Sequence, residues 1–444
     1  MSRLEPTNEA SAMQKEISAI AEQGGGRATK VEQLIQQYCP DGVEYKGIES
    51  VTKSICSGLN PRKNFTLNGK GAICYYLTVK EMTTGKIVFS DKTDKITPDA
   101  VNTIQNRSRL ETDDILLSGI GTIGKVAIVD IPVDNWNCSE SVLLLKPKKE
   151  IIYPKYLKYI LEGNETQTYF NSHATGSTLK GIRQKDLRTH FIPVPPLPVQ
   201  EEIVRILDTL TELQAELQAE LQAELQKRKQ QYEYYRDKLL SFSDLGNWGG
   251  RNVSVEWKKL GEIGKVCMCK RILKEQTFST GDIPFFKIGT FGGSADAYIS
   301  KELFDEYVKK YSYPKKGDIL ISAAGTIGRT VVFDGTPSYF QDSNIVWLKH
   351  DESVVLNSYL RYIYSLNPWA ISTGGTIARL YNDNILNAII PVPPLAEQQR
   401  IVSILDRFDT LTTDITAGLP AEIEARRKQY EYYRDQLLTF KQKA

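Results

Sequence analysis

The strongest constraint on the fold of this chain is the stretch LQAELQAELQAEL at residues 213–225. Leu, Gln, Ala and Glu are all good helix formers, and the repeated unit contains no glycine or proline, so the stretch is predicted to be helical. Helical apolar spacing extends this prediction to residues 199–242, after a proline cluster that ends at Pro198. Leucines four residues apart advance by about 40° per unit, because one helical turn takes about 3.6 residues. We therefore expect a spacer helix with an apolar stripe that winds slowly around it.

The chain as a whole is a direct repeat of one unit. Segments of the first copy return in the second: residues 43–55, 114–130, 175–182, 191–210 and 231–242 match 255–267, 318–334, 373–380, 389–408 and 429–440. From residue 175 onward the offset is a constant 198 residues, so the two helical arms have the same length. The globular parts diverge much more than the helices do. This pattern favours a shared scaffold that carries two different recognition modules.

Each copy is predicted to be a globular α+β domain followed by a long helix. Short β-rich runs separated by turn signals lie at 72–79, 86–89, 114–118, 125–130 and 141–146, and helices are expected at 31–38 and 153–163. The predicted domain plan is an N-terminal tail or short helix at 1–30, a first globular domain at 31–198, a central helix at 199–245, a second globular domain at 246–394 and a C-terminal helix at 395–444.

The second helical arm keeps the apolar positions of the first, although its LQAE texture is gone. The positions expected to form the helix–helix contact are Leu213, Leu217, Leu221 and Leu225 in the first arm and Leu411, Ile415, Leu419 and Ile423 in the second. Apolar residues at every matched position are what two helices packed against each other require. Gly418 and Pro420 predict an interruption of the second arm, with Pro420 in a new first turn.

The composition excludes several classes of protein. No apolar run approaches the roughly 20 residues that span a bilayer, and the N-terminus has no secretory signal. The six cysteines are scattered without zinc or redox spacing, so we expect reduced thiols in a cytoplasmic protein with no membrane association. The net charge of +2 is low for a stand-alone nucleic-acid binder. Any binding to nucleic acid must then use local basic patches, or a partner must supply much of the phosphate contact.

The chain also lacks the motifs of common active sites. Residues 119–126, GIGTIGKV, nearly match a phosphate-binding loop, but Val126 replaces the hydroxyl that binds magnesium and a strand pattern follows. A glycine turn between two strands is the preferred interpretation. There is no methyltransferase tetrapeptide of the Asn/Asp-Pro-Pro-aromatic type, and His173, His190 and His350 are isolated in the sequence. We expect a non-catalytic chain with no metal site.

Two loops, 175–180 and 373–379, are rich in glycine and hydroxyl groups and carry a basic residue close behind. Such loops can present backbone N–H groups and a cation to phosphate, although a plain solvent loop is an equally good interpretation. The candidate DNA-binding residues come from these loops, the glycine turns and nearby basic positions: Lys80, Arg107, Arg109, Lys125, Ser177, Thr178, Lys180, Arg183, Lys270, Arg271, Lys287, Thr326, Arg329, Thr376 and Arg379.

Taken together, these features resemble the specificity subunits of type I restriction–modification systems, the HsdS family. The resemblance covers nearly the whole chain after about residue 31. Its carriers are PDGVEYKGI (40–48), the paired GTIG turns, the paired PVPPL segments (193–208 and 391–406), GLPAEIEARRKQYEYYRD (418–435) and the tetrapeptide repeat. It implies an α+β fold with a pseudo-two-fold internal repeat. Two globular α/β target recognition domains would be separated by two long helices packed as an antiparallel coiled coil.

The resemblance also implies partners. Each recognition domain would read one half of an interrupted site in double-stranded DNA, while the helices set the gap and bind two methyltransferase (modification) subunits. Restriction subunits would complete the nuclease. S-adenosylmethionine, ATP and magnesium would belong to those partners, with no cofactor in this chain. The alternative from another class of protein is a non-catalytic coiled-coil scaffold that binds protein partners only.

One LQAE unit adds about 6 Å of helix, against about 3.4 Å per base pair of DNA. Deletion or insertion of one unit should therefore shorten or lengthen the tolerated gap between half-sites by about one or two base pairs. Methylation mapping of a strain that carries the one-unit deletion, beside a strain with the unaltered chain, measures this gap. An unchanged gap contradicts a ruler role for the helix.

Overall fold

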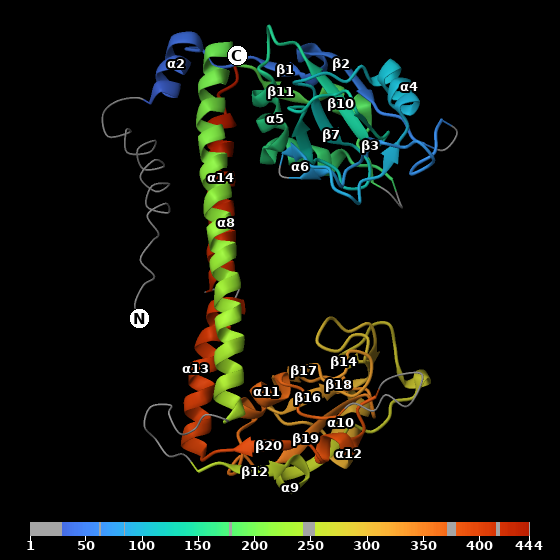
Figure 1. Cartoon of the computed structure of the whole chain (residues 1–444), viewed down its shortest axis with the longest axis vertical. Coiled ribbons are helices and arrows are strands. Elements are labelled where there is room, and N and C mark those ends of the chain that lie inside the picture. Colours follow the sequence, from blue (N-terminus) through green and yellow to red (C-terminus); the bar gives the residue numbers. More distant parts are fainter. Residues whose placement is uncertain are drawn as a thin grey trace. The chain divides into compact units, whose positions relative to one another are not determined.

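The computed structural model of the protein describes residues 29–61, 64–83, 85–176, 180–242, 254–370, 379–413 and 418–443 (Figure 1). These residues form two compact units. The first unit contains the chain up to Leu221 together with the C-terminal segment from Ile423, and the second unit contains Gln222–Glu422. Each unit therefore combines one globular domain with segments of both helical arms.

The globular domain of the first unit is built around a four-stranded antiparallel sheet of order β2-β10-β7-β8 and a three-stranded sheet of order β6-β3-β9. Strands β3 and β9 run parallel, while β1 pairs with β11 and β4 with β5. The elements are α2 (Lys30–Tyr38), β1 (Tyr45–Gly47), α3 (Ile48–Val51), β2 (Thr52–Ser57), β3 (Cys74–Leu77), β4 (Met82–Thr83), β5 (Lys86–Ile87), β6 (Lys95–Ile96), α4 (Pro98–Ser108), β7 (Ile115–Ser118), β8 (Val126–Ile128), β9 (Trp136–Cys138), β10 (Val142–Pro147), α5 (Pro154–Glu162), α6 (Asn164–His173), α7 (Gln184–Thr189) and β11 (Phe191–Pro193).

The second unit repeats this plan. Its four-stranded sheet has the order β13-β19-β16-β17, its three-stranded sheet has the order β15-β14-β18 with β14 and β18 parallel, and β12 pairs with β20. The elements are β12 (Glu256–Lys259), α9 (Leu260–Ile263), β13 (Gly264–Met268), η1 (Lys274–Gln276), β14 (Ile283–Phe286), β15 (Tyr298–Ile299), α10 (Lys301–Lys310), β16 (Ile319–Ser322), β17 (Thr330–Val332), β18 (Tyr339–Phe340), β19 (Ile345–His350), α11 (Asn357–Ser365), α12 (Asn382–Leu386), β20 (Ile389–Val392) and α13 (Leu395–Thr413).

Matched strand orders confirm both the internal repeat and the α+β fold class. The central strands are continuous apolar runs because both of their faces are covered. In β7, Ile115 and Leu117 face the core shared with the helices, while Leu116 faces the core under the three-stranded sheet. In β16, Ile319 and Ile321 likewise face one core and Leu320 faces the other. Successive side chains of a strand point to opposite faces, so one short apolar run closes two cores at once.

In the first unit, α8 (Leu197–Ser241) packs against α14 (Leu419–Leu438) (Figure 1). Leu210 and Leu217 are buried there beside Tyr430 and Leu437. The hydroxyls of Thr211 and Tyr430 lie 2.8 Å apart. The start of α8 shares a core with the end of α14, and later α8 residues meet earlier α14 residues, so the two segments run antiparallel, as the family resemblance implies.

In the second unit, the last turns of α8 share a core with α13. Leu239 and Leu240 are buried with Ile401 and Leu405, and the rings of Tyr235 and Phe408 stack with centroids 5.9 Å apart. Among the predicted contact positions, Leu217 and Leu419 are buried. The others that the structure describes are half-buried: Leu213, Leu221, Leu225, Leu411 and Ile423. Ile415 lies outside the described residues.

The ends of the long helices follow from proline. Helix α8 begins at Leu197, two residues before the predicted start, because Pro198 occupies a first-turn position where its missing N–H costs no hydrogen bond. In the described part of the second arm, α13 ends at Thr413 and α14 begins at Leu419 after a bend at Gly418, in agreement with the interruption predicted there; residues 414–417 lie outside the described residues. Pro420 lies in the first turn of α14, as predicted.

A fully buried glutamine joins each long helix to its globular domain. The Gln200 and Gln398 side chains are both 0% exposed. Each side-chain amide accepts one backbone N–H bond and donates two hydrogen bonds to backbone carbonyls: Gln200 bonds Tyr153 N at 2.8 Å, Ile151 O at 3.0 Å and Pro195 O at 2.6 Å, and Gln398 bonds Leu356 N at 2.9 Å, Val354 O at 3.0 Å and Pro393 O at 2.8 Å. The same pattern in both units fixes the proline segment to the loop before α5 or α11.

Replacing either glutamine with alanine should lower the free energy of unfolding of its unit by about 3–5 kcal/mol, because three buried backbone groups lose their partners. Thermal unfolding of Gln200→Ala and Gln398→Ala beside the unaltered chain measures this loss. The exposed neighbour Gln399 provides a control, since Gln399→Ala should change stability by less than about 0.5 kcal/mol. Equal effects for Gln398→Ala and Gln399→Ala contradict the anchoring role.

His190 is a buried polar residue found only in the first unit. It is 6% exposed, stacks on Tyr169 with centroids 4.1 Å apart, and its Nε2 lies 3.1 Å from the hydroxyl of Thr166. Burial, with a smaller contribution from the charge of His173, lowers the pKa of His190 to about 4. Ala388 stands at the matching position of the second unit. The fold of the first unit therefore favours the neutral form of this histidine.

This site predicts a loss of stability in mild acid. The pKa of His190 is about 4 when folded and 6.5 when unfolded, so its contribution is complete above pH 6.5 and is lost as the pH falls toward 4. Between pH 7 and pH 5, the loss should be about 2 kcal/mol. His190→Gln should lose about 2 kcal/mol less unfolding free energy than the unaltered chain between these two pH values. Calorimetric scans of both proteins at pH 7 and pH 5 measure the difference. A variant that keeps the full drop would show that other groups cause it.

Candidate nucleic-acid interface

The glycine turn after β7 is a closed structure. Lys125 N donates to the Ser118 hydroxyl at 2.8 Å, and Gly124 N donates to Ser118 O at 3.0 Å. Gly121 and Gly124 have φ values of +82° and +88°, in the region that favours glycine. The chain then enters β8, which pairs with β7. This confirms the predicted glycine turn between two strands and excludes the helix that a phosphate-binding loop requires.

The second loop singled out from the sequence lies directly beside this turn. Thr175 and Gly181 exchange two backbone hydrogen bonds of 2.9 Å, so the two ends of this loop are paired with each other. Gly121 N donates to Lys180 O at 2.8 Å, and Ile182 N donates to Gly119 O at 2.9 Å. The structure therefore brings Lys125 and Lys180 onto adjacent loops. Ser177 and Thr178 lie outside the described residues.

A third segment, residues 78–80, contacts the glycine turn. It follows β3, and Val79 O accepts a hydrogen bond of 3.2 Å from the Lys125 ammonium. Lys80, Lys125 and Lys180 are all exposed. We call segments 78–80 and 119–125, together with the described loop ends 175–176 and 180–181, the first three-loop face.

The second unit has a matching second three-loop face, formed by segments 287–293, 323–329 and 379–380. Arg329 takes the place of Lys125, and its guanidinium donates to Gly292 O at 3.0 Å. Leu380 N donates to Ala323 O at 2.9 Å, which repeats the bond between Ile182 and Gly119.

Four candidate residues belong to the second three-loop face. Thr326 and Arg329 are exposed on the turn, and Lys287 pairs with Asp296 at 2.8 Å. The Arg379 guanidinium donates to Ser343 O at 3.0 Å. Thr376 lies outside the described residues.

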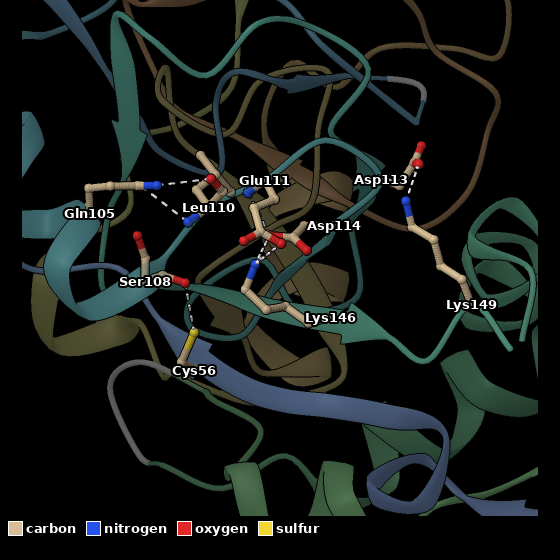
Figure 2. A network of polar contacts seen from close by, with 9 residues as sticks. All are labelled: Cys56, Gln105, Ser108, Leu110, Glu111, Asp113, Asp114, Lys146 and Lys149. Atoms are coloured by element: carbon tan, nitrogen blue, oxygen red, sulfur yellow. Dashed lines mark hydrogen bonds and ion pairs between the residues drawn. The ribbon is translucent and has the colours of Figure 1, made fainter. Parts of the chain in front are cut away.

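Arg107 and Arg109 lie away from the first three-loop face. They end α4 and lead into the start of β7, whereas the glycine turn follows the end of that strand. Figure 2 shows the polar network at this end of the sheet, where Lys146 bonds Asp114 at 2.8 Å and Lys149 bonds Asp113 at 2.6 Å. Burial raises the pKa of Asp114, and its hydrogen bond with Lys146 opposes that shift.

Arg183 is committed to an ion pair within its own unit. Its Nε lies 2.7 Å from Asp186 Oδ2 at the start of α7. The hydrogen bond with the carboxylate raises the pKa of Arg183 and lowers that of Asp186. Arg183 is therefore placed to hold the chain where it leaves the 175–181 loop.

Lys270 and Arg271 follow the end of β13, at the same end of the sheet as the second three-loop face. Met268 pairs with Val346 near the start of β19, and the Ser343 hydroxyl donates to the Met268 sulfur at 3.8 Å. Lys270 and Arg271 are exposed, and the Lys270 ammonium lies 5.2 Å from the centroid of the Tyr311 ring.

Lys80 and Lys287 are candidates from the sequence for a basic face, but their spacing does not predict which loops they join. Each follows the middle strand of a three-stranded sheet, and a carbonyl of the same segment, Val79 O or Gly292 O, accepts a bond from the basic residue of the glycine turn. The usable signal was the aromatic strand that precedes each lysine, CYYL before residue 78 and IPFF before residue 287.

Within the described ranges, no group of three His, Cys, Asp or Glu side chains is arranged to hold a metal ion. None of the helices in the same part of the chain has the length and apolar character needed to cross a membrane. The six cysteines are free thiols.

Comparison with known proteins gives concordant matches. Residues 40–227 and 252–425 match the family described as the type I restriction modification DNA specificity domain. A putative type I restriction enzyme specificity subunit of Haemophilus influenzae is 57% identical over 296 residues, which are 66% of this chain and 74% of that protein. The EcoR124I/EcoR124II specificity subunit of Escherichia coli is 39% identical over 264 residues, 56% of this chain and 61% of that protein.

A solved structure from work on the assembly and conformational transition of the type I R-M system has the same fold. Its TM-score is 0.60 at 19% identity, and the match covers 89% of this chain and 97% of that chain. The family matches include both copies of the internal repeat and most of both helical arms. They confirm the resemblance drawn from the sequence. The protein belongs to the family of type I restriction–modification specificity subunits, which are non-catalytic subunits that recognise DNA.

Proposed function

We propose that the two three-loop faces each read one half of an interrupted site in double-stranded DNA. The observation that carries this proposal is that both faces join the glycine turn to the later loop by a matched backbone hydrogen bond, and to a third segment through the basic side chain of the turn, while their exposed side chains differ. One framework with two sets of exposed residues suits two modules that recognise different sequences. A scaffold that binds only protein needs no such pair of basic faces.

The chemistry of the loops supports this role. Exposed lysine and arginine side chains neutralise phosphates and set the register of the protein on the duplex. Glycines in the turns let the backbone come close to the nucleic acid, where N–H groups can add phosphate contacts. The divergent side chains of the same loops would then distinguish base edges in a groove. We assign phosphate contacts to Lys80, Lys125 and Lys180 in the first unit and to Lys287, Arg329 and Arg379 in the second.

The long helices would set the gap between the half-sites. Helix α8 has 45 residues, which corresponds to about 68 Å of helix. The nearly identical segments 231–242 and 429–440 supply two like surfaces, which suits two copies of one modification subunit. We further propose that S-adenosylmethionine is bound by those subunits, and ATP and magnesium by the restriction subunits. The site of action would be the cytoplasm, where free thiols persist.

The turn residues provide a direct test. Lys125→Ala and Arg329→Ala, each in the complex with modification subunits, should weaken binding to DNA of any sequence. Each loss of one phosphate contact should reduce the slope of log K against log salt by about 1, and the double variant by about 2. Binding titrations at several salt concentrations measure these slopes.

The matched control is Lys149→Ala, which removes an exposed lysine from the opposite end of the first sheet. Its slope should equal that of the unaltered complex. If both turn variants keep the slope of the unaltered complex, or if Lys149→Ala changes it equally, the DNA does not bind at these turns.

A further inference from the structure

One side-chain amide packs against the last glycine of each glycine turn, and we call this contact the brace. In the first unit, Gln167 of α6 donates its Nε2 to Gly124 O at 2.8 Å. The same nitrogen donates to Leu161 O, near the end of α5, at 2.6 Å. The amide oxygen of Gln167 packs so closely that a Cβ added at residue 124 would lie 2.3 Å from it. The turn is therefore tied to the helices, and its last glycine has no space for a side chain.

The second unit places an amide at the same point from a different sequence position. Asn367 follows α11, and its oxygen would lie 2.3 Å from a Cβ added at Gly328. Asn367 has φ +49°, a left-handed conformation that asparagine tolerates better than most residues. The buried Trp369 also reaches this glycine, with ring carbon Cζ2 3.5 Å from the added Cβ. In both units an amide oxygen therefore packs against the last glycine of the turn.

Polar contacts also join the helix beside each brace to a long helix. In the first unit, Asp208 of α8 accepts a 2.8 Å hydrogen bond from the Tyr159 hydroxyl and pairs with Lys155 at 2.6 Å, both from α5. In the second unit, Asp406 of α13 accepts the matching bond from Tyr362 of α11. The helix beside the amide, α5 or α11, is therefore also bonded to a long helix in each unit.

We propose that Gln167 and Asn367 are positioning residues for DNA recognition, each setting the orientation of one basic turn relative to its own helical arm. This inference rests on the proposed function of the three-loop faces. Neither residue needs to touch DNA in this role. Gln167 acts through Gly124 on Lys125, and Asn367 acts through Gly328 on Arg329. Because the two braces lie in separate units, each should affect only the half-site that its own unit reads.

The test uses the full chain expressed with its modification subunits in a host without adenine methylation, followed by sequencing of methylated positions. Gln167→Met keeps the length of the side chain but removes both donors and the amide oxygen. It should raise methylation of sites with one altered base in one half-site about tenfold relative to intact sites. Asn367→Ala should do the same for the other half-site. Thr168→Ala, an exposed change on the same helix α6, should leave both half-sites unaltered.

The outcomes separate a positioning role from a structural one. Reduced yield of complex with unchanged discrimination at both half-sites, or equal relaxation at both, overturns the proposal. If Gln167→Met does not assemble, the exposed Asn367→Ala still tests the matching brace. Failure of the underlying function has another signature: Lys125→Ala and Arg329→Ala would then leave DNA binding intact. If Lys125→Ala and Arg329→Ala weaken DNA binding but neither amide variant has an effect, the positioning role is wrong and the proposed function stands.

Discussion

The structure depends on one contact made twice, the buried glutamine at the start of each long helical arm. A fully buried amide that bonds three backbone groups is costly to disturb, because those groups have no water to replace it. Gln200 and Gln398 occupy matched positions and bond matched partners, so each globular domain is held to its helix in the same way. Buried tyrosines reinforce the joint, since Tyr156 and Tyr359 donate to Pro193 O and Pro391 O at 3.2 and 3.1 Å. A joint of this kind is what the proposed spacing role of the helices requires.

The helices themselves needed little beyond local patterning. The LQAE units specify a helix by propensity. Pro198 lies in the first turn of α8, and Pro420 lies in the first turn of α14 in the other arm. The antiparallel pairing also rests on residues outside the tetrapeptide repeat, such as Thr211 with Tyr430 and Tyr235 with Phe408. Since LQAE units are interchangeable, contacts at their flanks are needed to define which turn of one helix meets which turn of the other.

The sequence predicted the repeat, the fold class and the glycine turns, because each has a short-range signature in residue type or spacing. It could not predict which loops meet. Val79 and Lys125 are 46 residues apart, and they meet because β3 and β7 belong to different sheets that face each other across one core. The position of Arg107 at the opposite end of β7 from the turn is equally a property of topology. Gln167 carried no signal, since an isolated glutamine on a helix resembles any surface residue.

The bonds that join the loops of each face are mostly between backbone groups. Gly121 with Lys180, Ile182 with Gly119 and Leu380 with Ala323 connect N–H and carbonyl groups that every residue except proline provides. Most side chains on these loops can therefore be exchanged without dismantling the platform that presents them. Substitutions on these loops can thus change the exposed chemistry of each face while the fold stays the same, which is what the proposed recognition role requires.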